Sequence, residues 1–250
     1  MLINFSVENF RSFGEEQVLN LVASGKLQDH AEHCIPIGET GKNVLRAGVV
    51  YGANAAGKSN LVRAILLTQQ LIQFQGAGAF RRLAQSQYRF SKKKKPSSFE
   101  FRFLVNGQMF VYGFSVTQKA VVEEWLEATT EKGRQEDVFV RTGQVISVGK
   151  LSKFGHEGNV SEKALNALQV LKPRPDQLLL NKVVDLPESS RGELLNRVAW
   201  WFTECLTVIQ AASSFTPLLE LLDRQADFNR FAGQFLHNIG TGINDLRIDQ

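Results

Sequence analysis

The feature that most constrains this sequence is the run from Gly52 to Ser59. Its letters, Gly-Ala-Asn-Ala-Ala-Gly-Lys-Ser, match the phosphate-binding pattern G-x-x-x-x-G-K-[ST] over its whole length. Gly52 and Gly57 can adopt backbone angles that are closed to other residues, so the loop can curve around an anion and point N–H groups at it. The apolar segment Arg46–Tyr51 precedes the loop and predicts a short strand. An amphipathic helix is predicted to start at Ser59, and this strand–loop–helix order is the context that the motif requires.

This loop predicts a site for ATP with Mg²⁺. Lys58 would supply a positive charge to the β- and γ-phosphates, and the Ser59 hydroxyl would ligate the magnesium ion. The N-terminus of the following helix would add its partial positive charge. The nucleotide-binding residues predicted for the loop are Gly52, Ala53, Asn54, Ala55, Ala56, Gly57, Lys58, Ser59 and Asn60.

The pattern of the chain predicts an α/β fold in three segments. Residues 1–95 form an N-terminal lobe that carries the loop, with a helix ending at Gly76 and then a basic, pattern-poor stretch. Residues 96–150 read as an antiparallel β-meander, because Phe99–Phe103 alternates strictly and Asn106-Gly107 is a strong hairpin signal. Residues 151–250 are predicted to be a helical subdomain.

Composition excludes several other classes of protein. Hydrophobic residues make up 43% of the 250 residues and the net charge is +4, an ordinary globular balance. Two cysteines far apart in the sequence give no disulfide framework, and the cluster of His30, His33 and Cys34 lacks a fourth ligand at metal-binding spacing. No apolar run approaches the roughly 20 residues that span a bilayer. We therefore expect a cytoplasmic protein without membrane contact.

Two segments carry a resemblance to known families. Tyr51–Asn60 resembles the G-x-N-x-x-G-K-S loop of the SMC, RecF and related ABC-type ATPases. Asn9–Phe13 reads Asn-Phe-Arg-Ser-Phe and, with that loop, resembles the AAA-type ATP-binding protein family related to the overcoming-lysogenization-defect (OLD) ATPases. Weaker matches cover most of the remaining chain: Pro96–Phe101, Tyr112–Phe114, Glu123–Leu126, Trp200–Val208 and Gly240–Asp245.

The resemblance implies a P-loop fold of the ABC-ATPase head type. It also implies that Arg11 and Ser12 lie beside the nucleotide, near the base or the ribose and α-phosphate. The alternative for Arg11 is a surface position at the exit of a strand. Phe10 and Phe13 are predicted to belong to the core.

An ABC-type ATPase also needs a Walker B strand, a signature motif and a switch histidine. Val183–Asp185 lacks the acidic residue that should follow it, no Ser-Gly-Gly triplet exists, and Gln85 and Gln87 are equal candidates for the Q-loop. We therefore expect that the chain stops before its Walker B motif and hydrolyses ATP weakly or not at all when isolated.

Three functions are open on this reading. The resemblance favours an ATPase head that forms head-to-head dimers and acts as a nucleotide-gated switch for an effector nuclease or toxin in bacterial anti-phage defence. The alternative is a DNA repair or recombination ATPase that contacts DNA through Arg81-Arg82 and Lys92–Lys95, although the lysine run can also be a solvated loop. The third is a scaffold that binds ATP without turnover. Glu123 and Glu124 are not an acid–base pair, because adjacent strand residues face opposite sides.

Overall fold

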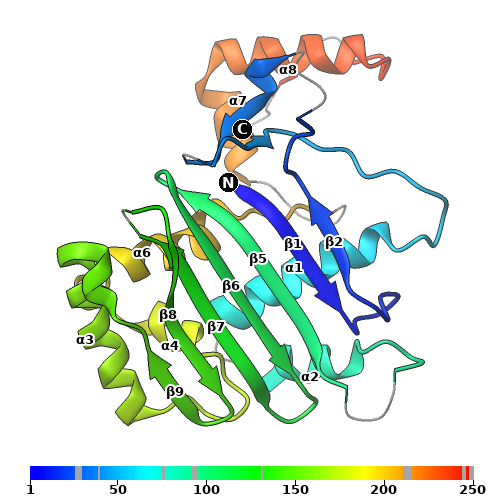
Figure 1. Ribbon diagram of the computed structural model, residues 1–250. Coiled ribbons are helices and arrows are strands. Elements are labelled where there is room, and N and C mark those ends of the chain that lie inside the picture. Colours follow the sequence, from blue (N-terminus) through cyan, green and yellow to red (C-terminus); the bar gives the residue numbers. More distant parts are fainter. Residues whose placement is uncertain are drawn as a thin grey trace. The chain divides into compact units, whose positions relative to one another are not determined.

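The computed structural model describes residues 1–25, 30–38, 40–74, 77–91, 95–130, 132–210, 216–243 and 246–247. The chain forms two compact units, Met1–Val208 and Ile209–Gln250. The first contains every strand found among the described residues (Figure 1). The second contains helices α7 (Thr216–Arg224) and α8 (Ala226–Asn238).

The first unit is built on a seven-stranded sheet with the order β2-β1-β5-β6-β7-β8-β9, and each pair of neighbours is antiparallel. Its strands are β1 (Leu2–Glu8), β2 (Gln17–Asn20), β5 (Ser97–Val105), β6 (Gln108–Val116), β7 (Val121–Thr129), β8 (Gln135–Thr142) and β9 (Val145–Val148). The predicted meander is confirmed, and the Asn106-Gly107 turn has the two positive φ angles, 48° and 79°, of a tight hairpin. Since β1 pairs with β5, the meander continues the sheet begun by the N-terminal strand. The segment boundaries at residues 95 and 150 stay a prediction.

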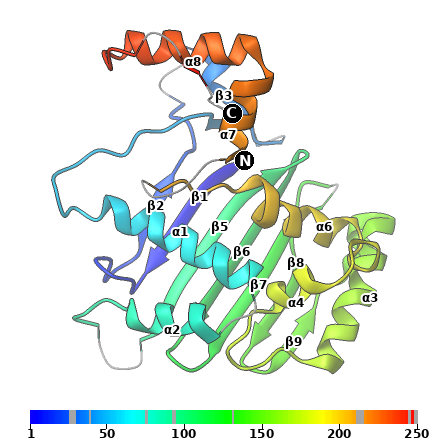
Figure 2. The same ribbon diagram turned by 180° about the vertical axis from the view of Figure 1, so that it is seen from behind.

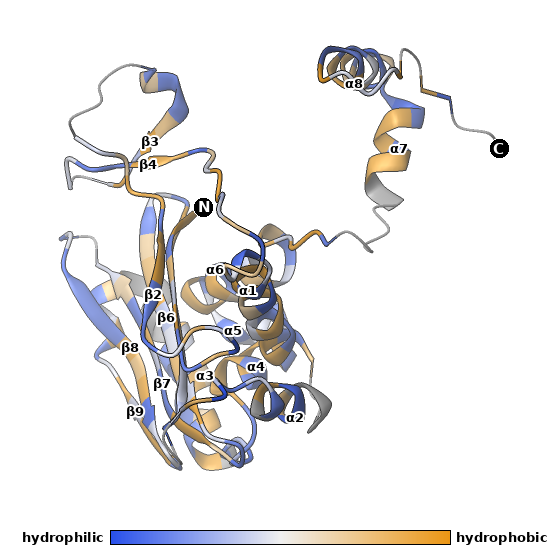
Figure 3. Cartoon of the chain, turned by 90° about the vertical axis from the view of Figure 1, so that its right-hand side faces the viewer, coloured by the Kyte–Doolittle hydropathy of each residue, from blue (hydrophilic) through white to orange (hydrophobic). Residues whose placement is uncertain are grey.

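Helices cover one face of this sheet (Figures 2 and 3). The helical elements of the first unit are η1 (Ala31–His33), α1 (Lys58–Gln73), α2 (Ala77–Gln85), η2 (Leu151–Phe154), α3 (Gly155–Leu171), α4 (Leu179–Asp185), α5 (Glu188–Arg191), α6 (Glu193–Trp200) and the π-helical turn η3 (Trp201–Cys205). A separate two-stranded hairpin pairs β3 (Cys34–Pro36) with β4 (Asn43–Leu45). The sequence predicted no regular structure from Arg81 onward, but helix α2 extends to Gln85. The helix forms because Phe80 and Leu83 recur at helical spacing and both are buried.

The core lies between the sheet and the helices. Phe99, Phe101 and Phe103 are buried as their alternation predicted, while Glu100 and Arg102 between them face the side without helices. The ring of Phe103 stacks on that of Trp201 with centroids 4.1 Å apart. Aromatic contacts of this kind join the sheet to η3, the π-helical turn that follows α6.

A buried carboxylate links the sheet to the helical layer. Glu124 on β7 lies directly opposite Arg141 on β8, and both side chains are fully buried, with 3.5 Å between Oε2 and Nη1. The carboxylate accepts the backbone N–H groups of Leu179 and Leu180 at 2.6 and 2.8 Å, and the Tyr112 hydroxyl at 3.0 Å. Burial raises the pKa of Glu124, against the opposing effects of Arg141 and of the two N–H groups. Glu124 therefore caps the start of α4, where Leu178 supplies no side-chain cap.

Arg141 completes this network from the other side. Its guanidinium donates to the carbonyl oxygens of Gly143, Gln177 and Arg174 at 2.8, 2.6 and 3.2 Å. The last two belong to the segment that leads into α4. The pair therefore satisfies the charge on both partners while it holds that segment against the sheet.

Removing the Glu124 charge should destabilise the protein strongly. In Glu124→Gln the buried guanidinium of Arg141 loses its counter-charge, and breaking one partner of a buried ion pair costs about 3–5 kcal/mol. The matched control is Glu123→Gln, at the adjacent exposed position on the same strand, which should change the free energy of unfolding by less than about 0.5 kcal/mol. Urea denaturation of both variants checks the difference. Equal effects at the two positions would contradict the role of Glu124.

Candidate functional site

The loop predicted to bind phosphate leads directly into α1. The helix begins at Lys58, and Gly57 is its N-cap with φ 98° and ψ −2°, a conformation that only glycine adopts readily. The carbonyl oxygen of Gly57 accepts the N–H groups of Asn60 and Leu61 at 2.8 and 3.1 Å. The N–H groups of the first helical residues have no intrahelical acceptor, so this end of α1 is suited to an anion.

A hollow of about 390 Å³ lies at this helix start. Its volume is within the range of about 300–1,000 Å³ that small-ligand sites occupy. The lining residues are Asn54, Ala55, Ala56, Gly57, Lys58, Ser59, Asn60 and Arg63. The structure thus brings together most of the predicted loop residues and adds Arg63, which sequence reasoning missed. Its position, four residues after Ser59 on the same helix face, was the available signal.

The charges around the hollow favour an anion. No carboxylate is among its lining residues, and the first turn of α1 contains no acidic residue. The Lys58 ammonium donates to the carbonyl oxygens of Gly52 and Ala53 at 2.6 and 2.8 Å. These two bonds keep the ammonium at the loop and hold the loop's first residues against the start of the helix.

Ser12 lies against the loop. Its Oγ accepts a hydrogen bond from Asn60 Nδ2 at 2.9 Å, and a Cβ added to Gly57 would lie 2.9 Å from the same oxygen. Phe13 also approaches Gly57, since that Cβ would lie 3.2 Å from Phe13 Cε1. The turn after β1 and the phosphate-binding loop are therefore in direct contact.

Arg11 is exposed and its side chain has a different neighbour. Its guanidinium carbon lies 5.8 Å from the ring centroid of Phe10, and its backbone N–H donates to Ser86 O at 2.6 Å. Within the described part of the chain no contact joins its side chain to the loop. The place of Arg11 beside a nucleotide therefore stays a prediction. Phe10 is buried and Phe13 packs against the core, as the sequence predicted.

Helix α1 is held in place along its second half. Leu67, Leu71 and Ile72 are buried against the core. Gln69 and Gln73 each donate to the carbonyl oxygen of Phe202, at 2.9 and 2.8 Å. The loop is therefore carried by a helix whose far end is fixed by both apolar packing and hydrogen bonds.

The prediction of a strand at Arg46–Tyr51 is wrong. Strand β4 ends at Leu45, and the residues from Arg46 to Tyr51 belong to no strand, with Val49 88% and Tyr51 91% exposed. Arg46 N–H donates to His33 O, but from residue 47 to Tyr51 no backbone hydrogen bond to another described residue is found. Apolar content alone predicted a strand here, and a strand requires a partner that the described chain does not supply.

Three other sequence candidates lie away from this hollow. Val183–Asp185, weighed as a Walker B segment, belongs to helix α4 rather than to a strand. Gln85 and Gln87 are not among the residues lining the hollow, and Gln87 Nε2 donates to Lys95 O at 3.4 Å. Of the basic run, Lys92 to Lys94 lie outside the described residues, and Lys95 pairs with Glu8 at 2.6 Å.

The histidine cluster has a different composition from the one expected. The ligand atoms of His30, Glu32 and His33 lie within 4.8 Å of one another, and all three residues are exposed. Glu32 Oε1 is 3.1 Å from His30 Nδ1 and 3.7 Å from His33 Nε2. Glu32, rather than Cys34, is thus the third member of this surface group, and its hydrogen bond with His30 accounts for their approach.

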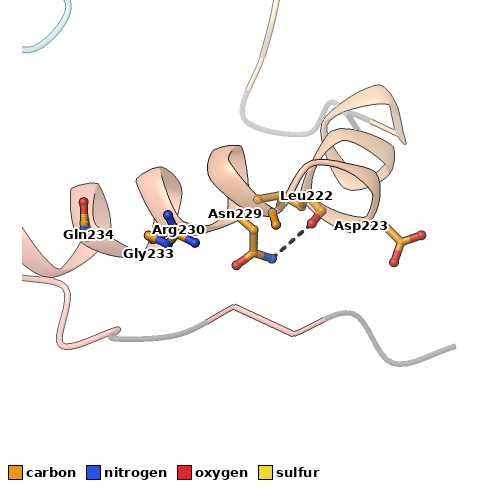
Figure 4. A pocket seen from close by; sticks show the side chains of 7 residues that line it. Leu222, Asp223, Asn229, Arg230, Gly233 and Gln234 are labelled. Carbon is orange, nitrogen blue, oxygen red and sulfur yellow. Dashed lines mark hydrogen bonds between the residues drawn. The ribbon is translucent and has the colours of Figure 1, made fainter.

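A second hollow, of about 620 Å³, lies in the unit formed by α7 and α8 (Figure 4). Asn229 Nδ2 donates to Leu222 O at 3.1 Å, and Asp223 and Arg230 also line it. None of the residues predicted for a site lies there. The first hollow is therefore the stronger candidate for a functional site.

Gly57→Ala should destabilise the protein more than a glycine change of similar backbone angle elsewhere. A left-handed backbone angle costs an L-residue about 1–2 kcal/mol, and crowding against Ser12 Oγ and Phe13 adds about 1 kcal/mol or more. Gly107→Ala is the control, because Gly107 has φ 79° and open space around its Cβ position. Thermal or urea unfolding of both variants measures the crowding contribution. Equal destabilisation would show that the loop does not press on the Ser12 turn.

One comparison with known protein families covers the part of the chain that carries the loop, from residue 49 to residue 245. A family model described as "AAA domain, putative AbiEii toxin, Type IV TA system" matches residues 49–245, which include the loop, the hollow and the meander. No curated protein matches the chain. In the described part of the chain no helix combines the length and apolarity that a membrane crossing requires. Because the matched region covers well over half of the chain, the protein belongs to this family of AAA domains.

Proposed function

We propose that this protein binds ATP with Mg²⁺ at Gly52–Ser59 and serves as the nucleotide-binding part of an ATPase. The observation that carries the proposal is the hollow at the start of α1, which is lined by Lys58 and Ser59 and by no carboxylate. Membership of a family of AAA domains supports the same activity.

The residues of the loop have separate roles in this proposal. Backbone N–H groups of the loop and the first turn of α1 bind the phosphate oxygens, and Lys58 turns its ammonium from the loop carbonyls toward the β- and γ-phosphates. The Ser59 hydroxyl, on the exposed first turn of α1, ligates Mg²⁺. Bound magnesium would neutralise charge on the phosphates during transfer. Ser12 and Asn60 fix the loop between the β1 turn and the helix.

Hydrolysis needs a carboxylate to orient the metal and activate water. None lines the hollow among the described residues. We therefore propose that turnover requires Walker B carboxylates that the described hollow does not contain, and a signature motif supplied by a second protomer in a head-to-head dimer of the kind used by SMC, RecF and OLD-like ATPases. In this view residues 1–250 alone bind ATP and hydrolyse it weakly or not at all.

The cellular role that we propose is a nucleotide-gated switch. The family description names a toxin of a type IV TA system, which is consistent with an ATPase that controls an effector nuclease or toxin in bacterial anti-phage defence. A DNA repair or recombination role is the alternative, and the observation in its favour is the exposed pair Arg81-Arg82 on α2. DNA affinity that falls steeply with salt and is lost on neutralising this pair would favour the alternative.

Replacing Lys58 should abolish ATP binding. Isothermal titration with ATP, or with a non-hydrolysable analogue, and Mg²⁺ should show a loss of about 100-fold or more in Lys58→Ala, since a charge-assisted contact to phosphate contributes about 1.5–3 kcal/mol and the ammonium also organises the loop. Lys119→Ala, an exposed lysine in the β6–β7 turn, is the control with the same change in charge. In Ser59→Ala the dependence of affinity on Mg²⁺ should weaken. Wild-type protein that binds no nucleotide would refute the proposal.

A further inference from the structure

Arg63 is a charged residue of the hollow that the phosphate-binding motif does not include. It lies on α1, one turn after Ser59, and its exposed side chain lines the hollow. A helix rises about 1.5 Å per residue, so its backbone lies about 6 Å further along the axis than that of Ser59. The side chain is nevertheless directed back toward the start of the helix, because Nη1 donates to Asn60 Oδ1 at 3.1 Å.

A short chain of hydrogen bonds fixes this orientation. The Asn60 amide accepts from Arg63 through Oδ1 and donates to Ser12 Oγ through Nδ2, at 3.1 and 2.9 Å. The amide can make both bonds only in one orientation, with its oxygen toward the arginine. Ser12 in turn lies against Gly57. The guanidinium is therefore positioned relative to the loop, although it is exposed.

The remaining donors of Arg63 are available to a ligand. A guanidinium has five N–H groups in a planar fork, and one nitrogen is used by Asn60. No carboxylate of the described residues forms an ion pair with Arg63 or lines the hollow. A cation placed in a hollow without acidic residues, next to a helix N-terminus, is suited to an anionic oxygen and can bind it through two N–H groups.

We propose that Arg63 binds the α-phosphate of the nucleotide and that Asn60 is the residue that positions it. This inference rests on the proposed function of the loop. Lys58 and Ser59 lie at the loop end of the hollow, where the β- and γ-phosphates and Mg²⁺ bind. Arg63 lies at the end one turn along the helix, so the phosphate it reaches is the one nearest the nucleoside. Arg63 therefore contributes equally to the binding of ATP and of ADP.

The test is the affinity of ATP and ADP for Arg63→Gln, measured by isothermal titration at two salt concentrations. A charge-assisted contact predicts that both affinities fall by about 10- to 100-fold and that the salt dependence of binding becomes smaller. Arg63→Lys should restore part of the affinity, because it keeps the charge without the planar fork. Asn60→Ala should weaken ATP and ADP binding in the wild-type background but have little further effect in Arg63→Gln.

The matched control is Arg82→Gln, an exposed arginine on α2 that does not line the hollow and that donates to Gln70 Oε1 at 3.3 Å. It removes the same charge and should leave both affinities unchanged. Because Arg63 is exposed, thermal unfolding of Arg63→Gln without nucleotide should match the wild type.

The outcomes separate the two proposals. If wild type binds ATP, Lys58→Ala does not, and Arg63→Gln binds both nucleotides as wild type does, the role of Arg63 is overturned while the loop's function stands. A loss for ATP but not for ADP also overturns the assignment to the α-phosphate. If wild type binds neither nucleotide, both the function of the loop and the role of Arg63 fall.

Discussion

The carboxylate of Glu124 is the interaction on which the arrangement of the site depends. Burying a charge is unfavourable unless its oxygens are satisfied, and here two backbone N–H groups of α4, one hydroxyl and one guanidinium satisfy them. The same bonds place α4 on the sheet. Asn181 on α4 then donates to Ile72 O at 2.8 Å, near the end of α1. The position of the helix that carries the phosphate-binding loop is thus coupled to a charge buried in the sheet.

The phosphate-binding loop makes more contacts with the rest of the protein on one side than on the other. On its helical side the loop continues into α1, and at Gly57 it meets Ser12 and Phe13 from the turn after β1. On its other side the chain reaches Gly52 through residues 47–51, which are exposed and make no backbone hydrogen bond to another described residue. The loop is therefore held by packing and hydrogen bonds at its helical end, and by few contacts at the end where the chain enters it.

The sequence predicted the parts of this structure that local patterns determine. Alternation at Phe99–Phe103 and the Asn106-Gly107 turn define neighbouring strands, and the loop motif with the helix after it is contiguous in sequence. The prediction of a strand at Arg46–Tyr51 failed because strand formation depends on a distant partner strand, which local composition does not reveal. Helix α2 was missed since its apolar residues are few.

Side-chain roles that depend on distant contacts were equally hard to predict. The alternation of a strand correctly put Glu123 and Glu124 on opposite faces. It gave no sign that Glu124 would cap a helix whose first residues are 55 and 56 positions further along the chain. Arg63 was missed for a different reason, because the loop motif ends before it. Its spacing from Ser59 placed it on the same helix face, but the contact with Asn60 that directs its side chain into the hollow depends on the fold. Positive charge without a carboxylate binds phosphate strongly but activates no water. In the function that we propose, a site with this distribution of charge therefore binds the nucleotide first and catalyses its hydrolysis only when acid groups are added to it.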